Sequence, residues 1–135
     1  MVKKLLFTAL LLTALSAPCY TESEIELCAR VVAAEARGES YESQLAVATV
    51  IANRVEDGRW GEGLREVVLA ENQFAEPFYD EYPQSCYLAA QEVLGSGFRL
   101  FDRAIQSFQR RDAEHWDGKP KFARIDSMTF YANSE

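Results

Sequence analysis

The sequence predicts a mainly α-helical α+β domain with a small β element near its C-terminus. Apolar residues recur at helical spacing through the first two thirds of the chain, whereas residues 128–131, "MTFY", have the composition of a strand. The 135 residues suffice for one domain, and 48% hydrophobic with 26% charged residues is a globular composition. No internal repeat or low-complexity segment suggests a second domain.

The N-terminal segment has the pattern of a secretory signal. Lys3 and Lys4 precede a weakly polar to apolar run over residues 5–17, and Pro18 then interrupts it. The run is short for a transmembrane helix. We therefore expect residues 1–19 to be a signal peptide and residues 20–135 to be the mature domain, exported to the periplasm or secreted. A retained N-terminal anchor is the alternative.

Three helices are expected. Thr21 with Glu24, or Ser23 with Glu26 in the next register, forms a capping-box pattern that starts the first helix, and Gly38 is its natural end. The second helix is expected over residues 41–56, with Gly58 beyond its end, and the third over residues 85–94. Residues 64–69 form a short helical turn. Residues 100–109 fit either a helix or a strand, and "DGKP" at 117–120 is a turn.

The charge of the chain is strongly negative. The formal charge is −7, and it falls to −9 without Lys3 and Lys4. This balance argues against nucleic acid as a partner of the domain. A basic run in the C-terminal third is either a solvated face or a surface that faces an anionic polymer, and it comprises Arg110, Arg111, Lys119, Lys121 and Arg124.

The cysteines predict one disulfide. Cys19 lies at the signal boundary, which leaves Cys28 and Cys86 within the mature domain. Two cysteines in a small exported domain commonly pair. A Cys28–Cys86 bridge closes a long loop and would contribute about 4 kcal/mol in the loop-entropy model.

Glu35 is the candidate for proton transfer. At helical spacing it lies on the same stripe as Cys28, Val31 and Val32, at the end of the first helix. A carboxyl at the end of an apolar stripe is partly desolvated, which raises its pKa and suits a general acid. Spacing alone leaves open the alternative of a solvated surface charge.

Four motifs resemble those of the SleB-type cell-wall hydrolases, the spore-cortex-lytic family. The resemblance covers roughly residues 24–131. The motifs are Glu35-Ala36-Arg37-Gly38-Glu39, Asn53-Arg54-Val55, Gln73-Phe74 and Thr129-Phe130-Tyr131. The resemblance implies a lysozyme-like fold and cleavage of the glycan strands of peptidoglycan, for wall remodelling or phage-type lysis. It implies no metal and no cofactor.

The resemblance also implies roles for single residues. Glu35 matches the catalytic acid of lytic transglycosylases, in which one glutamate serves as acid and then as base, so that no second carboxylate is required. Gln73, Phe74 and Tyr131 are expected to line the sugar cleft. Glu39 either contacts substrate or has a structural role, as a cap of the second helix or an anchor for Arg37.

The motifs are not all of the family type. Asn53 and Arg54 fit a structural role at a helix end. Where the family commonly has Gly-Asn-His before Thr-Phe-Tyr, this chain has Asp126, Ser127 and Met128. Any function of that histidine is therefore missing here or supplied from elsewhere.

Two other classes of protein fit parts of the sequence. Cys86 at a helix start and His115 resemble the pair of a thiol peptidoglycan endopeptidase, whereas a zinc amidase requires more than one histidine. A non-catalytic glycan-binding module is the second class, because aromatic rings are plentiful in the expected loops: Trp60, Phe74, Phe78, Tyr79, Tyr82 and Trp116.

Overall fold

The computed structural model describes residues 19–77 and 80–134. Nearly all of the predicted signal peptide therefore lies outside the described residues. The helices are α1 (Glu22–Ala36), α2 (Tyr41–Asp57), α3 (Gly63–Leu69) and α4 (Gln84–Ala90), and α4 continues into a π-helical turn, η1 (Gln91–Gly95). The strands are β1 (Ile105–Gln109), β2 (His115–Trp116), β3 (Lys119–Ile125) and β4 (Met128–Ala132). No helix within the described residues is long and apolar enough to cross a membrane.

Local sequence signals set the ends of the first two helices. The Thr21 side chain accepts from the Glu24 N–H, and the Glu24 carboxylate accepts from the Thr21 N–H, so the predicted capping box is present. Ser40 caps α2 through its hydroxyl, and Gly58 ends α2 with a φ of 84°. Glycine adopts this left-handed conformation without steric cost. The two helices match the prediction closely.

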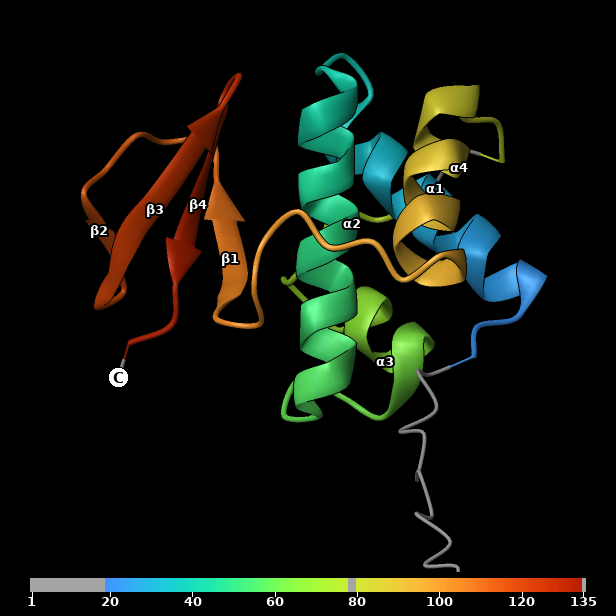
Figure 1. Cartoon of the computed structure of the whole chain (residues 1–135), viewed down its shortest axis with the longest axis horizontal. Coiled ribbons are helices and arrows are strands. Elements are labelled where there is room, and N and C mark those ends of the chain that lie inside the picture. Colours follow the sequence, from blue (N-terminus) through green and yellow to red (C-terminus); the bar gives the residue numbers. More distant parts are fainter. Residues whose placement is uncertain (1–18, 78–79, 135) are drawn as a thin grey trace, which may run out of the picture.

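Helix α2 is the centre of the fold (Figure 1). Helices α1 and α4 lie on one side of it, and the sheet lies on the other. Twelve consecutive residues of α2, from Ser43 to Arg54, are buried. A helix buried on all sides must satisfy its polar side chains internally. Asn53 illustrates this, because its amide donates to the carbonyl oxygens of Asp102 and Ile105, at 2.7 and 3.0 Å.

The β element is larger than the sequence predicts. Four antiparallel strands lie in the order β1–β4–β3–β2. Strand β1 resolves the ambiguity of residues 100–109, and β4 confirms the predicted strand. Strand β3 was not predicted, although its burial alternates residue by residue, because Pro120 and three basic residues obscure the pattern. Asp117 and Gly118 form the predicted turn, both with positive φ.

The turn between β3 and β4 is fastened to the start of α2. The Asp126 carboxylate accepts from the backbone N–H of Ser40 at 2.9 Å and from the hydroxyl of Ser43 at 2.8 Å. The Ser127 hydroxyl donates to the Glu39 carboxylate. The tip of the sheet is therefore held against the junction of α1 and α2.

Candidate active site

Glu35 lies in the last turn of α1 with a half-buried side chain. One carboxylate oxygen accepts from the backbone N–H of Ala75 at 2.6 Å. Its second oxygen has no hydrogen-bond donor among the described residues. The loop that contains Ala75 thus orients the carboxylate and leaves one oxygen available to a ligand.

Arg110 holds the end of α1 in place. Its guanidinium donates to the backbone carbonyl oxygen of Glu35 at 2.5 Å and to the hydroxyl of Ser127 at 3.2 Å. It also lies 3.4 Å from the Glu39 carboxylate. Arg110 follows β1 directly, so the sheet positions the backbone of the candidate acid. Sequence reasoning did not single out Arg110 for this role.

Glu39 has structural partners. Its carboxylate contacts Ser127 and Arg110, and its side chain is only 16% exposed. The cap of α2 is Ser40 instead of Glu39, which corrects one of the expected roles. Because its partners join the helices to the sheet, these contacts favour the structural interpretation over substrate binding.

Arg54 is a buried cation at the centre of the site. Its Nε donates to the Gln106 carbonyl oxygen at 2.7 Å, and one terminal nitrogen donates to the Gln73 side chain at 3.1 Å. Its guanidinium lies 3.9 Å from the centre of the Trp60 ring and 4.8 Å from that of Phe74. Burial lowers the pKa of Arg54 to about 10, and the Glu35 carboxylate opposes this shift.

Arg54 therefore has a further role beside the structural one that was expected at the helix end. The residue organises the side chains of Gln73 and Trp60 and lines a groove. A cation in the apolar run of α2 was the signal that could have identified it, because a buried charge requires partners.

The groove lies between the helices and the sheet. It has a volume of about 270 Å³. One wall comes from the end of α2 and the loops that follow it, and the other from β1 and the β2–β3 hairpin. Its lining residues are Arg54, Trp60, Asn72, Gln73, Ser107, Phe108, Trp116, Asp117 and Lys119.

The two residues of the predicted Gln73-Phe74 motif lie in different environments. Gln73 is exposed and lines the groove, as expected of a residue that could bind a hydroxyl or acetamido group. Phe74 is buried, with its ring 6.2 Å from that of Phe108. It packs beneath the groove next to Arg54. Because Gln73 and Ala75 belong to one loop, this loop joins the groove to the Glu35 carboxylate.

Tyr131 is not on the cleft surface, contrary to expectation. Its side chain is fully buried. The hydroxyl accepts from the Gln109 side chain at 2.8 Å and donates to the Arg111 carbonyl oxygen at 3.3 Å. The ring lies 5.6 Å from that of Trp116, so Tyr131 supports an aromatic residue of the groove from behind. Met128, where the family commonly has histidine, is also fully buried.

The cysteines lack the features of a nucleophile. Cys28 and Cys86 are both buried and carry free thiols, so the predicted bridge is not formed in the structure. Burial raises the pKa of Cys28 to about 12 and also raises that of Cys86. A buried, protonated thiol is a poor nucleophile. His115 is exposed on β2, at the outer edge of the sheet.

The sequence matches a family model. Residues 38–131 match the model described as cell wall hydrolase. The match begins three residues after Glu35, so the candidate acid precedes the matched segment. A curated relative, the spore cortex-lytic enzyme of Oceanobacillus iheyensis, is 40% identical over 55 residues, which are 41% of this chain. The aligned segment spans about a fifth of the length of that relative, 20%.

Two solved structures share the fold. The catalytic domain of the Bacillus cereus SleB protein superposes with a TM-score of 0.72 at 23% identity, covering 83% of this chain and 91% of the other. The catalytic domain of the germination-specific lytic transglycosylase SleB from Bacillus anthracis gives a TM-score of 0.71 at 24% identity, covering 83% and 96%. At these identities the superpositions establish the lysozyme-like fold.

Proposed function

Because the chain belongs to the cell wall hydrolase family, we propose that it cleaves the glycan strands of peptidoglycan with Glu35 as its acid and base. The names of its relatives support the choice of substrate, since one is a spore cortex-lytic enzyme and another a germination-specific lytic transglycosylase. We also propose that the chain acts outside the cell membrane after export, where this substrate is found.

The position of Glu35 is the observation that carries the proposal. Its carboxylate is held by the Ala75 N–H on one oxygen, at the end of the loop whose Gln73 lines the groove. The Glu35 carboxylate is also close enough to Arg54, which lines the groove, to raise the pKa of that guanidinium against the effect of burial. Geometry of this kind is the first requirement of a general acid.

The chemistry requires one carboxyl group. Protonated Glu35 gives its proton to the glycosidic oxygen as the bond from that oxygen to the anomeric carbon of muramic acid breaks. The resulting carboxylate then takes the proton of the 6-hydroxyl as that oxygen bonds to the anomeric carbon. The products are a free 4-hydroxyl and a 1,6-anhydromuramic end, and Glu35 is protonated again.

The substitution Glu35→Gln tests this role. It should lower turnover of purified peptidoglycan by at least about a thousandfold, because the acid and the base are lost together, while binding persists. Glu26→Gln is the matched control, since Glu26 is an exposed glutamate on the same helix. Unchanged turnover in Glu35→Gln would contradict the assignment, and a wild type that binds glycan without cleaving it would indicate a binding module.

Mass spectrometry of the digest identifies the reaction. Anhydromuramic ends are expected of a transglycosylase. Reducing muramic ends would show that water attacks the anomeric carbon in place of the 6-hydroxyl, and the enzyme would then be a muramidase. Cut peptides on intact glycan would contradict both readings and indicate a peptidase.

A further inference from the structure

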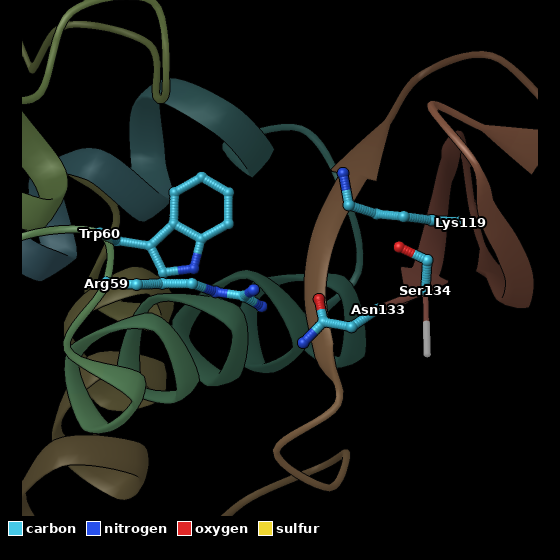
Figure 2. Close-up of a pocket in the computed structure, with 5 residues that line it drawn as sticks. All are labelled: Arg59, Trp60, Lys119, Asn133 and Ser134. Atoms are coloured by element: carbon cyan, nitrogen blue, oxygen red, sulfur yellow. The ribbon is translucent and has the colours of Figure 1, made fainter.

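A second pocket adjoins the groove (Figure 2). Arg59 and Trp60 face it from the helical side, and Lys119, Asn133 and Ser134 line it from the sheet side. Its volume is about 270 Å³. Because Trp60 and Lys119 also line the groove, the two cavities adjoin. We call this cavity the distal pocket.

The distal pocket is positively charged in an acidic protein. Lys119 is half-buried, and its ammonium lies 5.6 Å from the centre of the Trp116 ring. No carboxylate pairs with Lys119 among the described residues. Arg59 pairs with Asp57 at 3.2 Å, but its side chain is still 57% exposed. With a formal charge of −7 on the chain, an ammonium without a carboxylate partner at a pocket wall indicates an anionic ligand.

Trp60 is an unsuitable platform for a sugar ring. Its indole nitrogen donates to the Gln106 side chain at 2.8 Å, which fixes the ring. The guanidinium of Arg54 lies 3.9 Å and that of Arg59 5.8 Å from the ring centre. Two cations of the protein thus already lie over this ring. Trp60 instead forms a rigid apolar wall, which strengthens the attraction between a bound anion and the neighbouring cations.

We propose that the distal pocket binds a carboxylate of the stem peptide of peptidoglycan. The inference rests on the proposed function. The sugar backbone of a peptidoglycan strand is uncharged where each lactyl group is in amide linkage, whereas stem peptides carry free carboxylates. Lys119 provides the charge, and Arg59 and Asn133 provide further N–H donors at the same pocket. The pocket therefore selects strands whose stem peptides carry free carboxylates over strands whose peptide carboxylates are blocked.

The preference for strands with free peptide carboxylates is measured as the ratio of two kcat/KM values. Wild-type protein is compared on intact peptidoglycan and on the same peptidoglycan after the free carboxylates of its stem peptides have been converted to amides, which leaves the lactyl amides in place, and kcat/KM is determined for each. Lys119→Gln should lower the ratio of the two values about three- to tenfold, the effect of one partly screened charge pair. Lys119→Arg should retain the preference. Arg65→Gln, which removes an exposed charge from α3, should behave as wild type.

Binding to the inactive Glu35→Gln variant separates this inference from the proposed function. Its affinity for isolated strands with free peptide carboxylates should exceed that for strands whose peptide carboxylates are amidated, and Lys119→Gln in this background should remove most of the difference. Equal affinities for the two strands, or an equal loss on both in Lys119→Gln, would overturn the pocket assignment. A wild-type protein that shows this binding preference but cleaves no glycan would instead contradict the proposed reaction alone.

Discussion

Arg54 joins the core of the protein to its groove. Its hydrogen bonds reach a backbone carbonyl of β1 and the side chain of Gln73, and its charged group lies between two aromatic rings. The planar guanidinium can satisfy these contacts together because its donors point in different directions. A lysine side chain in the same position is shorter, and its ammonium lacks the planar arrangement of several N–H donors.

We therefore expect Arg54→Lys to lower the free energy of unfolding by about 2 kcal/mol, because a buried carbonyl or amide oxygen loses a charged donor. Urea denaturation followed by tryptophan fluorescence measures this loss. Arg65→Lys on the exposed face of α3 is the matched control and should leave the midpoint unchanged. An equal effect of the two substitutions would show that the contacts of Arg54 do not stabilise the fold.

Arg110 acts on the candidate acid through the backbone. Under the proposed function, Arg110→Ala should lower kcat about 10- to 100-fold with a much smaller change in KM, because a displaced carboxylate reacts poorly with a substrate that still binds. Arg110→Lys should recover part of the loss. Kinetics on purified peptidoglycan measure both parameters, and a change confined to KM would indicate that Arg110 contacts substrate instead.

At the scale of secondary-structure elements, the β3–β4 turn carries a carboxyl group, Asp126, that binds the sheet to the start of α2. Hydrogen bonds from the side chain and backbone N–H of Ser40, and from the Ser43 hydroxyl, lower the pKa of Asp126. A carboxyl whose pKa is lower in the folded state adds stability above its unfolded pKa, about 3.9, and loses it as the pH falls through the folded value. The docking of the sheet on α2 is therefore weakened by acid.

Asp126→Asn should reproduce the effect of acid at neutral pH. The free energy of unfolding of wild type should exceed that of the variant at pH 7, and the difference should shrink as the pH falls below about 4. Urea denaturation at pH 7, 5 and 3 measures it. A difference that stays constant over this range would assign the effect to something other than the charge of Asp126.

The elements differ in how far the sequence determines them. A capping box marked the start of α1, and glycines marked the ends of α1 and α2, because these signals are local. The helical periodicity of apolar residues also placed Glu35 on the stripe of α1 that contains Cys28. Strand β3 was missed because its pairing partner β4 determines it more than its own composition. Tyr131 was misplaced for a related reason, since the face of a strand on which a side chain lies depends on register.

The site was predictable only in part. Gln73, which a motif singled out, lies on a loop and lines the groove, and its contact with substrate stays a prediction. The contacts of Arg54, Arg110 and Lys119 depend on which segments the fold brings together, and each partner lies on another element. The sequence of a single element does not identify partner residues that lie on another element.

At the scale of the whole molecule, the predicted disulfide would join α1 to α4, which pack against each other. Both thiols are free and buried in the structure, so alkylation of the denatured, unreduced protein followed by mass spectrometry should modify Cys28 and Cys86 alike. Protection of the two cysteines until a reductant is added would instead show that the bridge forms.

The pairing of Arg54 with Gln106 also has a consequence for the order of assembly. The two residues are 52 positions apart. The groove wall on α2 can therefore pair with the wall on β1 only after more than a third of the described chain has been added. A ribosome-bound or unfolded chain that lacks β1 has neither the groove nor the guanidinium that fixes the end of α1. Maturation of the candidate site is thus coupled to completion of the C-terminal sheet.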